Sequence, residues 1–183
     1  FSSDLKQAAL EIVAPEDLAA RIGAVNTIDF SGSGPPTGYN TDAVGALRAL
    51  RDHDVTIQDA RAVVVGAGGA GRAIAFGLAD AGATVAIANR TESKAHALAE
   101  EVPRATGHGF GDLERLVANA DVVVNATSVG MESDATPVPA DALHEELAVL
   151  DAVYSPLETR LLRDAADAGA TTVDGAWMLL YQG

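Results

Sequence analysis

The chain has 183 residues, 48% of them hydrophobic, and a formal net charge of −14. This length supports one full domain with a substantial core and leaves little chain for a second. The charge excludes nucleic acid as a partner, because a phosphate backbone needs a basic face. The lack of cysteine excludes disulfides, thiolate metal sites and cysteine nucleophiles, and the scattered histidines predict no metal site.

The apolar segments are short, and none approaches the roughly 20 residues of a transmembrane helix. The first ten residues, FSSDLKQAAL, lack the basic start and apolar core of a signal peptide. We therefore expect a cytoplasmic protein that does not bind membranes. Acidic residues are spread along the chain beside only two lysines, which is typical of a halophilic protein. An acidic protein of ordinary habitat is the open alternative.

The first local signals lie ahead of residue 60. The tract SGSGPPTG at 31–38 is rich in glycine, serine and proline and predicts a turn or linker. A helix is expected over 41–53. Asn40, Thr41 or Asp42 could cap its first turn.

Short β-branched runs alternate with helical segments from residue 61 onward. Strands are predicted at 61–66, 84–89, 104–110, 120–127, 147–154 and 170–175. Helices are predicted at 69–82, 91–102, 111–119 and 157–169, and a last one begins at 176. Thr91 is the expected N-cap of the helix 91–102. The alternation predicts an α/β fold with a doubly wound parallel sheet covered on both faces.

A glycine-rich loop joins the first of these strands to the first helix. Gly66, Gly68 and Gly71 fit the pattern G-x-G-x-x-G. In dinucleotide-binding units the first glycine allows the tight turn, the second lets the backbone approach a pyrophosphate, and the third lets helix and strand pack closely. Because the flanking strand, helix and second strand are all expected here, the loop predicts a dinucleotide site.

The end of the second strand carries ANRT, where a dinucleotide site that selects NAD has an acid for the ribose hydroxyls. Asn89 removes the repulsion that an acid exerts on a 2′-phosphate. Arg90 offers a planar guanidinium for that phosphate, and Lys94 lies one helical turn further on. Thr91 adds a hydroxyl at a helix N-terminus, which favours an anion. We therefore predict an NADP(H)-specific site.

Two polar clusters precede the glycine loop. GAVNTI at 23–28 contributes Asn26, and GYNTDAVGALRAL at 38–50 contributes Asn40, Thr41 and Asp42. Amides, hydroxyls and a carboxylate suit a polyhydroxylated substrate. An aspartate at a helix N-terminus tends to stay ionised and could orient a proton-transferring partner.

Seven segments of the chain occur together, in this order, in one known family: GAVNT, GYNTDAVG, GAGGAGRA, ANRT, NATSVGM, LDAVYSPLETRLL and DGAWMLLYQG. By these segments, which run in order over almost the whole chain from Gly23, the chain resembles the shikimate dehydrogenases. The resemblance implies a Rossmann-like NADP-binding domain. It also implies NADPH-dependent reduction of 3-dehydroshikimate to shikimate, a step of aromatic amino-acid and chorismate biosynthesis.

The resemblance also implies roles for matching residues. Asn26, Asp42, Tyr154 and Gln182 would bind the substrate, with Asp42 also in the catalytic pair. The pyrophosphate would lie along the glycine loop, made of Gly66, Ala67, Gly68, Gly69, Ala70 and Gly71. The 2′-phosphate would be held by Asn89, Arg90, Thr91 and Lys94. The nicotinamide would be lined by Asn125, Ala126, Thr127, Ser128, Gly175 and Met178, although Met178 could equally belong to the core.

The resemblance divides the chain into three parts. Residues 1–41 would be the remnant of a substrate-binding domain, 42–175 the NADP-binding domain, and 176–183 the start of a helix returning to the substrate domain. The family's serine pair for the substrate carboxylate belongs to a region that this chain lacks. Its catalytic lysine lies in a segment like N-V-T-x-P-x-K. Lys6, twenty residues before Asn26, matches that lysine by spacing, although Asp4 stands where the family has proline.

Three alternatives to this function stay open at this point. One is a quinate or quinate/shikimate dehydrogenase, which would differ mostly in the substrate pocket. Another is a non-catalytic NADP(H)-binding module left by truncation, and the last is an α/β domain without a ligand. A glutamyl-tRNA reductase shares the glycine loop and the NRT-like turn, but it needs a nucleophilic cysteine that this chain lacks. A homodimer is compatible with all of these readings.

Overall fold

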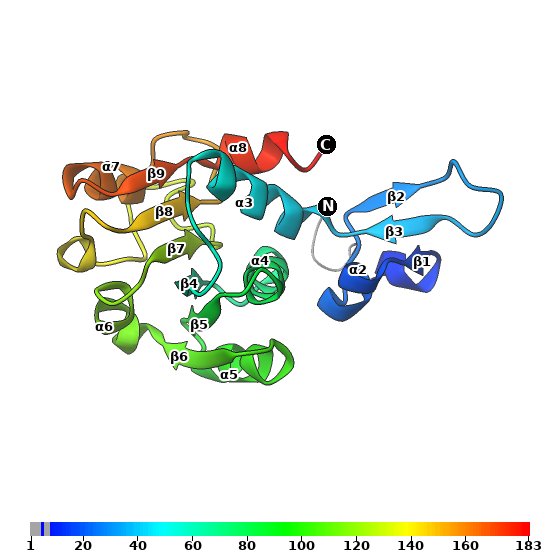
Figure 1. Ribbon diagram of the computed structural model, residues 1–183, viewed down its shortest axis with the longest axis horizontal. Coiled ribbons are helices and arrows are strands. Elements are labelled where there is room, and N and C mark those ends of the chain that lie inside the picture. The colour runs from blue at the N-terminus through cyan, green and yellow to red at the C-terminus, as the bar shows by residue number, and fades with distance from the viewer. Residues whose placement is uncertain (1–4, 6–7) are drawn as a thin grey trace.

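A computed structural model describes Leu5 and residues 8–183, which form two separate sheets (Figure 1). The larger sheet has six strands: β4 (Arg61–Val65), β5 (Thr84–Asn89), β6 (Ala105–Gly109), β7 (Val122–Asn125), β8 (Ala148–Asp151) and β9 (Thr171–Val173). All its pairings are parallel, and the strand order is β6-β5-β4-β7-β8-β9. The chain thus winds outward from β4 in one direction and from β7 in the other. The predicted doubly wound, Rossmann-like fold is confirmed.

Helices cover both faces of this sheet, as the alternation predicted. One face packs against α3 (Thr41–Asp52), α4 (Gly69–Asp80), α5 (Glu92–Glu101) and α8 (Gly175–Leu180). The other packs against α6 (Leu113–Val117), the 3-10 helix η3 (Ala140–Ala142) and α7 (Arg160–Asp167). Val64 lies in the first core and its neighbours Val63 and Val65 in the second. Since successive strand residues point to opposite faces, each central strand contributes to both cores.

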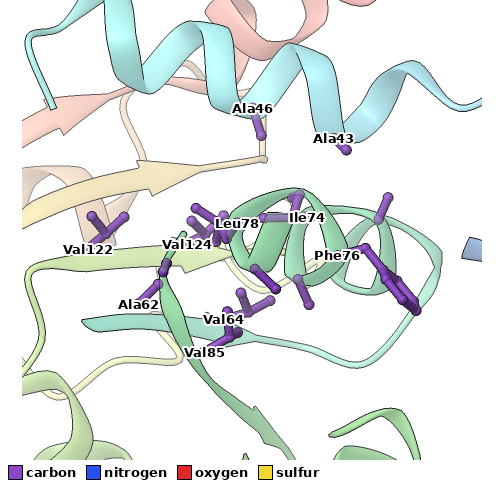
Figure 2. Packing of buried hydrophobic residues seen from close by; sticks show 14 of the residues in the cluster. Ala43, Ala46, Ala62, Val64, Ile74, Phe76, Leu78, Val85, Val122 and Val124 are labelled. Carbon is purple, nitrogen blue, oxygen red and sulfur yellow. The ribbon is translucent and has the colours of Figure 1, made fainter. Parts of the chain in front are cut away.

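Small residues let α3 and α4 approach closely above the sheet. Figure 2 shows Ala43 and Ala46 of α3 facing α4, whose Ile74 and Leu78 lie between α3 and the strands. A Cβ atom at Gly77 would lie 3.0 Å from the Cβ of Ala43. The close crossing fixes the start of α3, which carries Asp42, relative to the glycine-loop helix α4.

A second sheet of three short strands lies apart from the large one, beyond α3 and α4 in Figure 1. Its strands are β1 (Ala14–Pro15), β2 (Thr27–Asp29) and β3 (Thr37–Tyr39), in the order β1-β3-β2. The 3-10 helix η1 (Ala9–Glu11) precedes it, and α2 (Asp17–Ile22) joins β1 to β2. β3 then leads directly into α3, so the small sheet is covalently tied to the helix that carries Asp42.

Two arginines join α2 to α4. The guanidinium of Arg21 makes two hydrogen bonds to Asp80, at 2.8 and 2.9 Å. Arg72 donates to the carbonyl of Ile22 at the end of α2 and, at 2.8 and 2.6 Å, to Glu101 of α5. Each guanidinium carbon lies 5.3 Å from the centre of the Phe76 ring. Hydrogen bonds from Arg72 hold the pKa of Glu101 below its usual value.

Three predicted boundaries need correction, and one residue at its predicted cap position lacks the capping hydrogen bond. The expected linker 31–38 contains the start of β3, because Thr37 and Gly38 pair with β1 and β2. The helix expected at 111–119 is the 3-10 helix η2 (Phe110–Asp112) followed by α6. Thr91 is at the N-cap position of α5, but its side chain makes no capping hydrogen bond. The helix expected at 157–169 begins at Arg160, because the Thr159 hydroxyl caps it by accepting from the Leu162 N–H.

Candidate cofactor and substrate site

The glycine loop turns sharply from β4 into α4. Gly66 has φ +110°, a left-handed conformation that side chains rarely adopt, and its N–H donates to the Ala88 carbonyl at 2.8 Å. A Cβ atom at Gly71 would lie 2.0 Å from the Gly66 oxygen, whereas one at Gly68 would meet nothing within 4 Å. Two glycines are thus required by the turn itself. Gly68 instead leaves open space in front of the backbone, where a pyrophosphate would approach.

Asn89, the last residue of β5, links the glycine loop to the turn that follows β5. Its amide oxygen accepts from the Ala67 N–H at 3.3 Å, and its amide nitrogen donates to the Thr91 carbonyl at 2.9 Å. A carboxylate at this position could accept the first bond but could not donate the second. Asn89 therefore shapes the cofactor loop in addition to removing a negative charge.

Arg90 and Lys94 follow Asn89 on the exposed side of the turn. Both are exposed, and neither forms an ion pair with any residue that the structure describes. In a chain of net charge −14, they place two positive charges within five residues, and no described carboxylate neutralises either. They lie at the carboxyl end of β5 and in the first turn of α5, where an anion is favoured.

Asn26 and Asp42 meet on the side of the small sheet. The Asn26 amide donates to Asp42 Oδ1 at 2.9 Å, and the Asn26 oxygen accepts from the Thr41 N–H at 2.9 Å. Asp42 is 4% exposed. Asn40, among the three residues that could cap the helix, is the one that does so, because its oxygen accepts from the Asp42 N–H at 3.1 Å. The carboxylate of Asp42 is thus not the cap of α3.

The loop after β7 lies beside the glycine loop. A Cβ atom at Gly66 would be 2.9 Å from the Thr127 methyl, and one at Gly71 would be 3.5 Å from the Ala126 Cβ. Asn125 is fully buried, and its oxygen accepts from the Thr127 N–H and hydroxyl at 3.0 and 2.7 Å. The side chain of Asn125 therefore supports the loop from inside. Ser128 is exposed.

The strand order places these loops at one crevice. β4 and β7 are adjacent, and the chain leaves them toward opposite sides of the sheet. In open parallel sheets this switch point, at the carboxyl ends of the strands, is where ligands bind. The glycine loop and residues 126–128 lie next to each other at this switch point.

The last helix brings further predicted residues close to α3. A Cβ atom at Gly45 would lie 2.6 Å from the Met178 carbonyl and 2.9 Å from the Gln182 Cγ. Gly45 lies three residues after Asp42, so Gln182 packs on the face of α3 that carries Asp42. Met178 is 4% exposed and belongs to the core, and Gly175 is buried at the start of α8. Tyr154 is 51% exposed. Lys6 lies outside the described residues.

Comparison with known proteins identifies the family. A family model described as shikimate / quinate 5-dehydrogenase matches residues 48–155. The chain belongs to this family. The shikimate dehydrogenase (NADP+) of Haloarcula marismortui is 74% identical over 97% of the chain. The chain spans 66% of that relative's length.

Solved structures of the family share this fold. The shikimate 5-dehydrogenase of Thermus thermophilus, in complex with NADP(H) and shikimate, has a TM-score of 0.85 at 44% identity. The match covers 97% of this chain and 66% of that one. The quinate dehydrogenase of Corynebacterium glutamicum, in complex with NAD, has a TM-score of 0.91 at 34% identity, with 99% of this chain and 67% of that one covered.

Sequence reasoning missed one buried residue that supports this site. Asp151, at the end of β8, is fully buried. Its Oδ1 accepts from the Asn125 amide at 2.9 Å and the Val153 N–H at 3.0 Å, and its Oδ2 accepts from the Thr159 hydroxyl at 2.6 Å. Burial raises the pKa of Asp151, and these three hydrogen bonds oppose the rise. The sequence signal that could have indicated this residue is an acid at the end of an otherwise apolar strand, in LAVLD at 147–151.

In the part of the chain that the structure describes, no group of three or more His, Cys, Asp or Glu side chains could hold a metal ion. No described helix combines the length and apolarity needed to cross a membrane.

Proposed function

We propose that the chain is the NADP-binding and catalytic part of an enzyme that reduces 3-dehydroshikimate to shikimate with NADPH. The observation that carries the proposal is the Asn26–Asp42 hydrogen bond at the start of α3. It presents an amide and a carboxylate on the side of the small sheet, against the helix that begins with the glycine loop. The name of the 74% identical relative, shikimate dehydrogenase (NADP+), supports the same activity.

The residues of the cofactor crevice fit NADP(H). The open space at Gly68 accommodates a pyrophosphate, and Arg90 and Lys94 offer the positive charge that a 2′-phosphate needs. NADPH, when bound, supplies the hydride that reduces the C3 carbonyl of the substrate. Residues 126–128, Gly175 and Met178 would border the nicotinamide.

The residues around Asp42 would handle the substrate and its proton. We propose that Asn26, Asp42, Tyr154 and Gln182 hold the substrate hydroxyls. Asp42 and Lys6 would form the catalytic pair, in which the lysine stabilises the developing alkoxide and relays its proton. Asp42 would keep that lysine charged and oriented. Lys6 takes this role from its spacing of twenty residues ahead of Asn26.

The proposed domain organisation follows from the same roles. Residues 1–41 would belong to a substrate-binding domain, 42–175 to the NADP-binding domain, and 176–183 to a helix that returns toward the substrate domain. The small sheet and α2 would then position Asn26 from the substrate side. We further propose a cytoplasmic location, because both NADPH and shikimate are dissolved metabolites.

A spectrophotometric assay of the complete protein tests the activity. We expect NADP+ reduction with shikimate to exceed the rates with quinate or with NAD+. We also expect the activity to rise with salt, because screening relieves repulsion among the excess acids. A quinate preference with NAD+ would favour the quinate dehydrogenase alternative. NADPH binding without turnover would favour a non-catalytic module. Sedimentation of the same preparation reports whether the protein is a homodimer.

Two glycine-to-alanine variants separate the fold of the loop from its contact with the cofactor. Gly71→Ala is expected to destabilise the protein by roughly 1–3 kcal/mol or more, because its methyl would overlap the Gly66 carbonyl. Gly68→Ala is expected to leave thermal unfolding unchanged and to weaken NADPH binding, since its methyl would enter the pyrophosphate space. Differential scanning calorimetry and NADPH titration measure the two effects. Normal NADPH affinity in Gly68→Ala would contradict this placement of the pyrophosphate.

A further inference from the structure

Asp151 belongs to a network of hydrogen-bonded side chains that is buried inside the protein. Asp151, Asn125 and Thr159 are exposed by 0%, 0% and 1%. Burying a carboxylate is unfavourable unless hydrogen bonds replace the lost water, and even a well-paired buried charge adds little net stability. The stability of the fold is therefore a weak reason for an acid at this position. A stronger reason is that the carboxylate of Asp151 fixes the geometry of the surrounding loops.

The network ties Asp151 to three segments around the crevice. Through Asn125, whose oxygen holds the N–H and hydroxyl of Thr127, it reaches residues 126–128. Through Thr159 it reaches the first turn of α7. Through the Val153 N–H it fixes the chain after β8, against which α8 begins: a Cβ atom at Gly175 would lie 2.5 Å from the Val153 carbonyl.

Two of these segments are the ones that border the nicotinamide in the proposed function. Residues 126–128 lie beside the glycine loop, and Gly175 begins the helix that packs on α3. The carboxylate of Asp151 is fully buried and forms no hydrogen bond to residues 126–128 or to Gly175. It therefore acts on these two segments through the residues to which it is hydrogen-bonded.

We propose that Asp151 is a positioning residue for hydride transfer, which holds the loop 126–128 and the start of α8 at the distance that the nicotinamide requires. The proposal rests on the proposed function. It assigns no contact with substrate or cofactor to Asp151. It predicts that a change at Asp151 acts at the nicotinamide end of the site and spares the 2′-phosphate end.

The test replaces Asp151 by Asn in the complete protein. Asparagine has the same size but no charge, and its amide nitrogen cannot accept from the Thr159 hydroxyl, so that bond must reverse its direction or break. We expect kcat for shikimate oxidation to fall about tenfold to a hundredfold, since displacements of about 1 Å can have effects of this size. The Kd of adenosine 2′,5′-bisphosphate is expected to stay within about twofold, because this probe does not reach the nicotinamide end.

Further variants control for a general loss of structure. Thr159→Val removes one bond to Asp151 and is expected to lower kcat in the same direction, whereas Thr159→Ser keeps the hydroxyl and is expected to restore it. Asp121→Asn makes the same chemical change at the amino end of β7, where Asp121 pairs with Arg61 at 2.8 Å. It is expected to leave kcat unchanged.

Each outcome separates this proposal from the proposed function. A normal kcat in Asp151→Asn would overturn the positioning role, and so would a parallel loss of bisphosphate affinity, which indicates general unfolding. If Asp151→Asn does not fold, the two Thr159 variants provide the test. Equal kcat values in Thr159→Val and Thr159→Ser would overturn the proposal. A wild-type protein that oxidises no shikimate would contradict the proposed function, and this inference with it.

Discussion

Replacing Asp42 by Asn is expected to lower kcat for shikimate oxidation by about 10²- to 10⁴-fold, the usual contribution of a positioned acid or base. Asparagine keeps the size of the side chain and can still accept the hydrogen bond from Asn26. It loses the negative charge that would keep the proposed catalytic lysine charged and oriented. NADPH affinity should change little, because Asp42 lies at the start of α3 and not in the glycine loop. Steady-state kinetics and NADPH titration measure both quantities.

A matched control removes the same charge elsewhere. Asp167, the last residue of α7, is exposed and makes no ion pair with the described residues. Asp167→Asn is expected to leave kcat unchanged. Near-normal turnover in Asp42→Asn would remove Asp42 from the catalytic pair. If Asp42→Asn also lowers the melting temperature strongly, the loss of activity would reflect a structural role of Asp42 instead.

Replacing Arg90 and Lys94 together by Ala is expected to weaken NADPH binding by roughly a hundredfold. Hydrogen bonds to charged groups contribute about 1.5–3 kcal/mol each, and about 1.4 kcal/mol corresponds to a tenfold change in Kd. NADH, which lacks the 2′-phosphate, should lose far less. Because both side chains are exposed and unpaired among the described residues, the fold should not change. Isothermal titration with each cofactor measures the difference.

Arg115→Ala serves as the control for this double variant. Arg115 is exposed and pairs with Asp112 at 2.9 Å, on the opposite face of the sheet from α5. Its removal is expected to leave both cofactor affinities unchanged. Equal losses of NADPH and NADH affinity in the double variant would contradict the 2′-phosphate role.

The large sheet and its cofactor loop were predictable because their signals are local. A run such as RAVVVG predicts, within six residues, a strand, its burial and the position where it ends. Gly66 is required by its left-handed backbone conformation, φ +110°, and Gly71 by the Gly66 carbonyl within the same short turn. The ANRT turn likewise carries its charge pattern in consecutive residues. Such features depend little on what the rest of the chain does.

The buried network and the small sheet were not predictable because their partners are distant in sequence. Asn125 and Asp151 are 26 residues apart and meet only because β7 and β8 pair. Read alone, Asn125 after a strand indicates a ligand-binding amide, whereas its complete burial and its bonds to Asp151 and Thr127 appear only in the structure. β1 has two residues and pairs with β3, more than twenty residues later. A run this short has no periodicity to detect.

The contacts between α2 and α4 affect how the fold is maintained at high salt concentration. The relative from Haloarcula marismortui and the acidic composition both point to a saline habitat. At about 1 M salt the screening length is roughly 3 Å, so the exposed Arg21–Asp80 pair contributes little there. The carbonyl that accepts from Arg72 and the ring of Phe76 carry no net charge and are screened far less. We therefore expect the contacts of Arg72 to keep α2 against α4 as salinity changes, and with α2 the adjoining small sheet.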